Sequence, residues 1–504
     1  MTGVLDLPIT DLAERVRAGE ISAEELAKES LSAIERGRDL NAFLNVSADA
    51  ALEAARGIDA RRRGGKSLGP LAGVPIAIKD VLCTYDAPTT CASKILTRAE
   101  NGAPSSPAKG WRPPYDATAV ARLRAADAVL VGKTNMDEFA MGSSTENSAF
   151  GPAKNPWDPR RTPGGSSGGS AVAVAARMTP GSLGTDTGGS IRQPAALTGV
   201  VGVKPSYGRV SRYGAVAFAS SLDQIGPFAS DVRGAARLLR VIAGHDPHDS
   251  TSAQLPVDDY EAACDRPVKG LRLGVPAEYF EKGLDPDVAS SVHHAIAALE
   301  KEGCVVKPVN LPHTRYGVAC YYIVATAEAS SNLARFDGVR FGLRVEPPRG
   351  DLQAMYGATR ESGFGPEVKR RILLGTYVLS AGYYDAYYRQ AQKIRTLVKQ
   401  DFDRAFAEVD AITAPTSPTP AFELGERVED PLAMYLGDIY TLPASLAGIA
   451  GISVPCAPTP AKNGRPELPV GLQLLGPAFA EARLFQLAAC WEALSRVRTR
   501  PPAP

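Results

Sequence analysis

Residues 163–192, PGGSSGGSAVAVAARMTPGSLGTDTGGSIR, constrain the fold of this chain more than any other stretch. Two Gly/Ser clusters, at 164–170 and 187–190, are separated by a small-residue helical run and a short extended segment. Glycine at this density costs backbone entropy, so a folded protein keeps it where the main chain bends tightly or approaches a ligand closely. A flexible linker is the alternative, but linkers do not enclose an apolar run such as 171–176.

Ser190 ends the second cluster, where the sequence IRQPAAL predicts the start of a helix. A serine whose own N–H and the preceding glycine N–H groups point into one space has the parts of an oxyanion hole. A serine in such a place also needs a base to take its proton.

Three better-known glycine-rich sites do not match. The Gly-Lys-Thr at 132–134 has Asp127 where a phosphate-binding P-loop needs glycine, and the segment 155–163 before GGSSGG cannot be the strand that a dinucleotide fingerprint requires. The segment 164–168 formally matches the G-x-S-x-G nucleophile elbow, which also needs a preceding strand and a histidine partner. The chain's histidines all lie in segments that we interpret as surface or helix: His245, His248, His293, His294 and His313.

Lys79 is the next candidate base, because it ends the apolar strand predicted at 74–78. Burial disfavours the charged form of lysine, and a neutral lysine can accept a proton. At the ordinary pKa of about 10.4 only on the order of one lysine in a thousand is neutral at pH 7, so burial has to supply the activation. This segment alone leaves open a second interpretation, in which Lys79 is an exposed lysine at a strand end.

The three motifs GVPIAIKD at 73–80, GGSSGGS at 164–170 and GTDTGGSIR at 184–192 resemble the amidase signature family. That family is known for a Ser-cisSer-Lys triad whose bridging serine lies 24 residues before the nucleophile, the same separation as Ser166 and Ser190. The resemblance implies Ser190 as nucleophile, Ser166 as the bridge in the cis conformation and Lys79 as base.

The same resemblance implies an oxyanion hole made by main-chain N–H groups of Thr187, Gly188, Gly189 and Ser190. Asp186 and Arg192 flank this loop, and we interpret them as a structural brace. Ser167 is expected to hydrogen-bond within the loop without chemistry of its own.

The segment 136–146 follows a predicted strand, in a position where loops line a pocket. Its resemblance to the family segment beside the substrate implies that Met141, Gly142 and Ser143 wall the site. Structural filling is the alternative for each of the three.

Composition bounds the remaining possibilities. Lys plus Arg is 56 against 55 Asp plus Glu, so the net charge of +1 gives no electrostatic bias toward nucleic acid. No apolar run approaches the roughly 20 residues of a membrane span, and the first residues lack the apolar region of a signal peptide. The seven cysteines are scattered without a C-x-x-C pair, which favours reduced thiols in a cytoplasm over a disulfide or metal framework.

The order of helical and strand patterns predicts an α/β protein. The resemblance implies the amidase signature fold, a large mixed β-sheet core covered by helices on both faces, as one domain over 66–504 with its catalytic core at about 70–230. Residues 1–65 are predicted to be a helical appendage packed on the core, with a capping box from Ser22 to Glu25. Residues 97–113 are longer and more polar than the usual family link, and we interpret them as a surface loop insertion.

Four segments of the C-terminal third, at 321–337, 367–377, 382–388 and 434–440, are similar to the A subunits of glutamyl-tRNA(Gln)/aspartyl-tRNA(Asn) amidotransferases. That family recognises glutamine, whose α-carboxylate suits a guanidinium and whose α-ammonium suits a carboxylate.

Matching these motifs implies Arg371 for the carboxylate, Asp438 for the ammonium and Tyr322 for a supporting hydrogen bond. Two alternatives one residue away stay open, namely Arg370 in place of Arg371 and Tyr321 in place of Tyr322. Ser445 stands where the family usually has asparagine.

The resemblance implies a glutaminase that supplies ammonia to partner subunits B and C. The partner would bind the misacylated tRNA and use ATP and Mg²⁺ to convert Glu-tRNA(Gln) to Gln-tRNA(Gln), Asp-tRNA(Asn) to Asn-tRNA(Asn), or both. For this chain itself we expect no cofactor and no metal. A free-standing amidase acting on another small amide is the alternative. A scaffold that has lost its chemistry is disfavoured by intact Lys79, Ser166 and Ser190.

Overall fold

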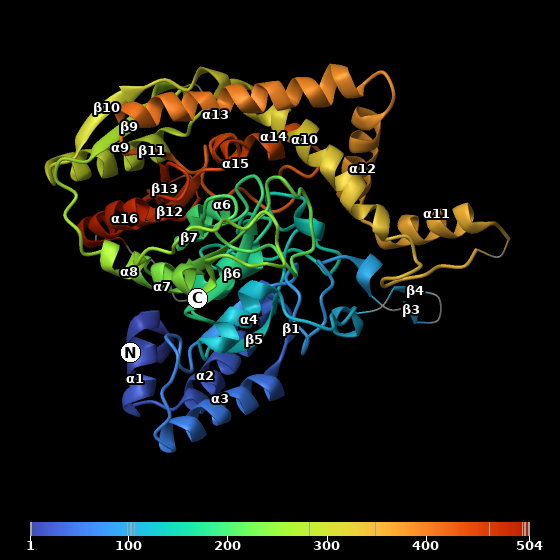
Figure 1. The fold of residues 1–504 in the computed structure, drawn as a ribbon, viewed down its shortest axis with the longest axis horizontal. Helices are drawn as coiled ribbons and strands as arrows, with labels where there is room; N and C mark the ends of the chain where they lie inside the picture. The colour runs from blue at the N-terminus through green and yellow to red at the C-terminus, as the bar shows by residue number, and fades with distance from the viewer. Residues whose placement is uncertain are drawn as a thin grey trace.

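The computed structural model describes residues 3–501 except residues 98, 101–102, 105, 282, 348, 463, 496 and 498–499. Figure 1 shows these residues as a broad sheet with helices packed around it and one narrow extension. Within this part of the chain, no helix is both long and apolar enough to cross a membrane.

One mixed sheet of eleven strands organises the described residues, in the order β1-β5-β2-β6-β8-β7-β12-β13-β11-β9-β10. β5, β2 and β6 are parallel neighbours, so their carboxyl ends lie at the same edge. The bounds are β1 Phe43–Val46, β2 Pro75–Lys79, β5 Val129–Thr134, β6 Gly181–Asp186, β7 Val201–Lys204, β8 Gln224–Ala229, β9 Arg272–Pro276, β10 Val305–Val309, β11 Ala411–Pro415, β12 Ala450–Thr459 and β13 Leu468–Gly476.

Sixteen α-helices accompany the sheet in the described residues. They are α1 Ile9–Ala18, α2 Ala23–Arg36, α3 Ala48–Arg63, α4 Thr118–Ala125, α5 Gly168–Ala175, α6 Arg192–Thr198, α7 Val232–Ile242, α8 Tyr260–Ala263, α9 Pro286–Lys301, α10 Gly317–Asn332, α11 Leu352–Gly363, α12 Pro366–Leu379, α13 Gln390–Glu408, α14 Pro431–Leu436, α15 Leu442–Ala447 and α16 Glu481–Ser495. The alternation of helices and strands confirms the α/β prediction.

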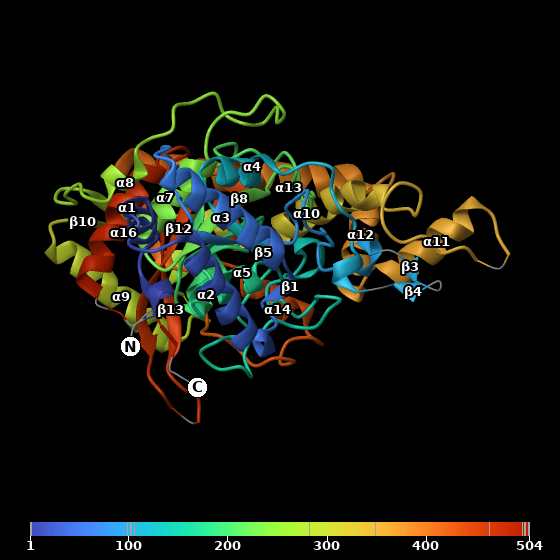
Figure 2. The same cartoon turned by 90° about the horizontal axis from the view of Figure 1, so that it is seen from below.

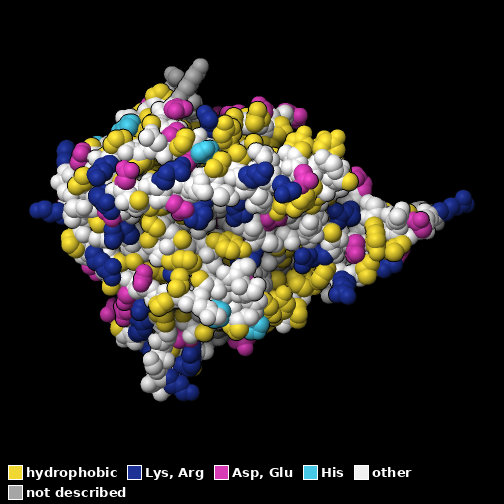
Figure 3. All heavy atoms as spheres, turned by 45° about the horizontal axis from the view of Figure 1, so that its top comes forward, with side chains coloured by type: hydrophobic (Ala, Val, Ile, Leu, Met, Phe, Trp, Pro, Cys, Tyr) yellow, Lys and Arg dark blue, Asp and Glu magenta, His cyan; other side chains and the backbone are white. Residues whose placement is uncertain are grey.

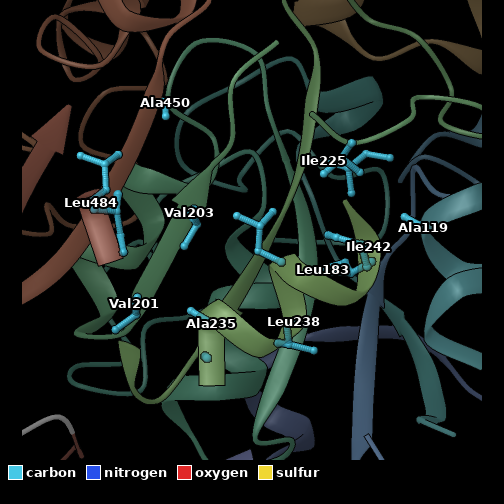
Figure 4. Packing of buried hydrophobic residues seen from close by; sticks show 14 of the residues in the cluster. Ala119, Leu183, Val201, Val203, Ile225, Ala235, Leu238, Ile242, Ala450 and Leu484 are labelled. Atoms are coloured by element: carbon cyan, nitrogen blue, oxygen red, sulfur yellow. The ribbon is translucent and has the colours of Figure 1, made fainter. Parts of the chain in front are cut away.

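Helices cover both faces of the sheet. Figure 4 shows the side packed by α7 and α16, where Leu484 of α16 lies near Val203 of β7 and Leu238 of α7 lies near Leu183 of β6. Ile225 of β8 belongs to the same buried cluster. The opposite face carries a second buried cluster, in which side chains of α5 and α6 surround Phe228. Side chains alternate along a strand, so Ile225 and Phe228 of β8 point to opposite faces.

The N-terminal 65 residues differ from the prediction at one place. Three helices form as expected, and Ser22 caps α2 with the predicted reciprocal hydrogen bonds to Glu25. Between α2 and α3, however, Phe43–Val46 forms β1, which pairs antiparallel with β5. The prediction of a helical appendage is wrong for these four residues, because a short strand at a sheet edge leaves little periodicity to detect.

The extension in Figures 1 and 2 consists of α11 and, beside it, a two-stranded ribbon. The ribbon is β3 Ala99–Glu100 paired with β4 Ala103–Pro104, followed by the 3₁₀ turn Pro107–Lys109. Residues 97–113, predicted as a loop insertion, thus contain regular structure, while residues 98, 101–102 and 105 lie outside the described part. Lys and Arg side chains are interspersed with Asp and Glu over the face in Figure 3.

Candidate active site

Lys79 lies at the carboxyl end of β2, completely buried between β5 and β6. Its Nζ donates hydrogen bonds of 2.8 Å to the hydroxyls of Ser166, Ser167 and Thr185. Burial lowers the pKa of Lys79 from 10.5 to about 7, against the opposing pull of nearby carboxylates. The structure therefore favours the buried interpretation of Lys79, and a substantial fraction of its amine is neutral near pH 7.

Ser166 lies in the loop before α5, and the peptide bond between Gly165 and Ser166 is cis, as the resemblance implied. Its carbonyl oxygen accepts a 3.1 Å hydrogen bond from the N–H of Asp137. The neighbouring Ser167 contacts Lys79 and also donates a 3.0 Å hydrogen bond to the carbonyl of Thr185. This loop is thus fixed to the ends of both β5 and β6, because Asp137 follows β5 and Thr185 belongs to β6.

The predicted nucleophile Ser190 lies in the turn that leaves β6 and enters α6, and 7% of its surface is exposed. The N–H of Ser167 donates a 3.3 Å hydrogen bond to the carbonyl of Ser190, which joins the two Gly/Ser loops. The Oγ of Ser166 accepts a hydrogen bond from Lys79. No side chain or main-chain group among the described residues forms a hydrogen bond with the Oγ of Ser190. The structure therefore contains the base-to-bridge contact but not the bridge-to-nucleophile contact.

The turn before Ser190 has little space for side chains. Gly189 has a φ of +151°, and a Cβ there would lie 2.2 Å from Oγ1 of Thr441. A Cβ on Gly188 would lie 2.7 Å from the ring of Tyr321. In the part of the chain that the structure describes, no group accepts a hydrogen bond from the N–H of Gly188, Gly189 or Ser190. These donors are available to a ligand, which the predicted oxyanion hole requires.

Asp186 and Arg192 hold the turn from its two sides. Their side chains are completely buried and form two 3.0 Å hydrogen bonds. Arg192 also donates to Ser445 at 3.0 Å and to Gln473 at 2.8 Å. The pair acts as the predicted brace, and Ser445, the position that departs from the family pattern, contacts this brace.

Asp438 lies beside the turn, and its Oδ1 is 3.2 Å from the position of a Cβ on Gly189. Its Oδ2 accepts a hydrogen bond from Ser143. Oδ1 is buried and has no hydrogen-bond partner among the described residues. Burial raises the pKa of Asp438 from 3.8 to about 7. A cation placed at Oδ1 would stabilise the ionised carboxylate.

Of the other two predicted wall residues, Met141 is completely buried. Gly142 packs against Asp137, because a Cβ there would lie 2.4 Å from Cγ of that side chain. Ser143 is the member of the trio that the structure brings to Asp438.

Arg371 lies on α12 with only 3% of its side chain exposed, whereas Arg370 is 50% exposed. Its Nε donates a 2.8 Å hydrogen bond to Glu367, and its guanidinium lies 5.2 Å from the ring centre of Tyr322 and 5.5 Å from that of Tyr435. The structure therefore favours Arg371 over Arg370 as the buried cation.

Two tyrosines on α10 connect the two charged groups. Tyr321 and Tyr322 meet edge-on at 5.1 Å, and both lie within electrostatic reach of Arg371 and Asp438. Tyr322 stacks on Tyr435 at 3.8 Å, while Tyr321 lies against Gly188. Arg371 and Asp438 thus lie within electrostatic reach of each other, with Tyr322 against the guanidinium and Tyr321 against the nucleophile turn.

Sequence reasoning did not assign several residues of this site. Thr185 accepts a hydrogen bond from Lys79, and Asp223 accepts one of 2.7 Å from Thr187. Glu367 accepts hydrogen bonds from both Arg371 and Tyr435. The spacing of Glu367 and Arg371, four residues apart on a predicted helix, is a signal for this ion pair. Within the described residues, no group of three or more His, Cys, Asp or Glu side chains could hold a metal ion.

The chain is similar to known proteins over most of its length. The family model described as Amidase matches residues 25–485. The chain is 59% identical over 482 residues to the A subunit of glutamyl-tRNA(Gln) amidotransferase from Acidobacterium capsulatum, covering 95% of this chain and 98% of that protein.

Two solved structures are similar over their whole length. One is the A subunit of glutamyl-tRNA(Gln) amidotransferase from Thermotoga maritima, with 40% identity, a TM-score of 0.78 and coverage of 100% of this chain and 99% of that one. The other is the native peptide amidase of Stenotrophomonas maltophilia, with 32% identity, a TM-score of 0.80 and coverage of 99% and 98%.

Proposed function

We propose that this chain, which belongs to the amidase family, hydrolyses the side-chain amide of glutamine as the A subunit of one tRNA-dependent amidotransferase complex. The observation that carries the proposal is that Asp438 lies against the Ser190 turn, with the buried guanidinium of Arg371 within electrostatic reach of it. A guanidinium and a carboxylate are the groups that an α-carboxylate and an α-ammonium require. The 59% identity to the Acidobacterium capsulatum protein over nearly the whole chain supports the same substrate.

The reaction begins with the neutral amine of Lys79. It accepts the proton of Ser166, while the Oγ of Ser166 accepts the proton of Ser190, and the Oγ of Ser190 attacks the amide carbon. The lowered pKa of Lys79 supports this role, because a lysine at its ordinary pKa would hold its own proton at pH 7. This step requires a hydrogen bond from the Oγ of Ser190 to the Oγ of Ser166, the contact that is missing from the structure.

The tetrahedral oxygen is held by N–H groups of the turn from Thr187 to Ser190. The relayed proton moves to the amide nitrogen, the carbon–nitrogen bond breaks, and ammonia leaves. Water then attacks the glutamyl ester of Ser190 and gives its proton to the same relay, which returns that proton to the Oγ of Ser190 as glutamate is released. The relay ends in the protonation state in which it began, so the chain requires no cofactor for this step.

Substrate recognition uses both ends of the amino acid. Arg371 binds the α-carboxylate, and Oδ1 of Asp438, which has no partner among the described residues, accepts from the α-ammonium. Ser143 orients Asp438 through the other carboxylate oxygen, and Tyr322 packs against Arg371. Met141 and Gly142 form the adjoining wall.

The proposed partners are amidotransferase subunits B and C. The ammonia would pass to the partner that binds misacylated tRNA and uses ATP with Mg²⁺. We propose the cytoplasm as the site of action, where the seven cysteines, all unpaired in the structure, would stay reduced.

A free-standing amidase is the second candidate, and the similarity to a peptide amidase favours it. The two differ in their dependence on the α-carboxylate and α-ammonium. We would measure ammonia release by the purified chain, alone and with subunits B and C, from glutamine, acetylated glutamine and a peptide with a C-terminal amide. Selective hydrolysis of glutamine is expected. Faster release from the peptide amide would identify the free-standing amidase instead.

A further inference from the structure

Glu138 is a buried acid outside the machinery described above. It begins the 3₁₀ turn Glu138–Ala140 after β5, and only 1% of its surface is exposed. One carboxylate oxygen accepts a hydrogen bond from Ser93, and the other accepts a 2.8 Å hydrogen bond from the N–H of Gly365. A buried carboxylate with two donors is held in one position.

Gly365 is the residue that caps the N-terminus of α12, the helix that carries Arg371. A carboxylate at a helix N-terminus satisfies a free N–H and interacts favourably with the helix dipole. Ser93 strengthens the connection, because its hydroxyl also lies 3.2 Å from the carbonyl of Gly363 at the end of α11. Glu138 and Ser93 together hold the junction of the two helices.

The residue after Glu138 enters the same junction. The ring of Phe139 contacts Phe364 at 5.7 Å and Phe336 at 5.0 Å. The chain on either side belongs to the site, since the main-chain N–H of Asp137 donates to the carbonyl of Ser166 and the hydroxyl of Ser143 donates to Asp438. The segment 137–143 therefore links the nucleophile loops to the start of α12.

We propose that Glu138 is a positioning residue that fixes the N-terminal end of α12 and thereby sets where Arg371 meets the α-carboxylate of the substrate. This role rests on the proposed function of Arg371. Loss of the negative charge at Glu138 weakens the attachment of the start of α12. The guanidinium of Arg371, nearly two turns further along the helix, is then no longer held in one position. Binding of the carboxylate weakens, whereas the chemistry at Ser190 is unchanged.

Burial raises the pKa of Glu138 from 4.5 to about 7. The charged groups that act on Glu138 are Lys94 beside Ser93 and Lys369 on α12, and Lys369 is also paired with Glu361 of α11 at 2.9 Å. The same elements carry Asp137 before Glu138, Arg360 at the end of α11, and Glu367, Arg370 and Arg371 on α12. Glu138 is ionised above about pH 7 and neutral below it. The hold on α12 is therefore strong at alkaline pH and weakens as the pH falls through 7.

The test compares the full chain, copurified with its proposed partner subunits, with the variant Glu138→Gln. Substrates are glutamine and 4-aminobutanamide, which has the amine and the amide but no α-carboxylate. We expect the KM for glutamine to rise roughly 5- to 20-fold, with kcat within about twofold and 4-aminobutanamide unaffected. The ratio of the two KM values varies with pH around 7 in the wild type and is constant in the variant. Glu300→Gln, an exposed change on α9, is the matched control.

Equal effects on both substrates, or a loss of kcat with KM unchanged, would overturn the role of Glu138. Absence of glutamine hydrolysis by the folded wild-type complex would overturn the proposed function as well, so the two failures are distinguishable. If Glu138→Gln lowers the melting temperature too far for assay, Ser93→Ala removes one of the two hydrogen bonds and keeps the charge. That variant is expected to raise the KM for glutamine alone by a smaller factor, and an unchanged KM contradicts the proposal.

Discussion

Replacing Asp438 with asparagine tests how the site recognises the α-ammonium of glutamine. Asparagine keeps the shape and can still accept the hydrogen bond from Ser143, but it removes the charge. Burial raises the pKa of Asp438 from 3.8 to about 7. This shift means that the site disfavours the ionised carboxylate by about 4 kcal/mol when no cation lies beside it. The ammonium of glutamine offsets this penalty, so the pair contributes only when substrate is bound.

We expect Asp438→Asn to lower kcat/KM for glutamine roughly 30- to 1,000-fold, which corresponds to about 2–4 kcal/mol of lost transition-state binding. Other buried charge pairs lose a similar amount when one member is removed. The assay measures ammonia release from glutamine and from glutaramate, which lacks the α-amino group. The variant should hydrolyse glutaramate at least as well as the wild type does. The matched control is Asp403→Asn on α13, where the side chain is 55% exposed. Equal losses for both substrates would refute the reasoning, because they would show that Asp438 acts on the amide and not on the ammonium.

Other predictions concern the base, the brace and the bridging loop. The kcat/KM for glutamine should rise with pH through about 7, because Lys79 must be neutral to accept a proton; a flat profile from pH 6 to 8 contradicts this role. Arg192→Leu leaves a buried carboxylate unpaired and should reduce the free energy of unfolding in urea by about 3–5 kcal/mol, whereas Arg160→Leu, which removes a 69% exposed side chain, should cost about 1 kcal/mol or less. Comparable losses would argue against the brace. Ser166→Ala should lower kcat by about 10³-fold or more and Ser167→Ala by only about tenfold, since Lys79 keeps its contacts to two other hydroxyls. Equal losses in rate assays would show that the relay does not run through Ser166 alone.

Much of the catalytic centre could be predicted because its parts lie in short, dense motifs. The apolar run before Lys79 predicted a buried strand, and that strand ends at Lys79 in the structure. The resemblance of the two Gly/Ser clusters to the amidase signature implied Ser166 and Ser190, and in the structure a hydrogen bond from Ser167 to Ser190 joins their loops. The carboxyl ends of β2 and β6 meet because the strands are parallel neighbours, and this adjacency brings Lys79 to Thr185.

The missed features depend on contacts between distant segments. Glu138 and Gly365 are 227 residues apart, and no local pattern indicates that one caps the helix of the other. The choice between Arg370 and Arg371 depends on which face of α12 is buried, because Glu367 pairs with both. Strand β1 was missed since its four residues pair with β5, which lies far along the chain, and the ribbon β3–β4 has only two residues per strand.

The most direct test of the account is glutamine-dependent amidation of Glu-tRNA(Gln) by this chain coexpressed with subunits B and C, with the wild type beside Ser190→Ala and free ammonia as a second nitrogen donor. We expect the variant to lose product formation with glutamine and to keep it with ammonia. Undiminished product from glutamine in the variant would contradict the role of Ser190. Product from ammonia but not from glutamine in the wild type would contradict the glutaminase function itself.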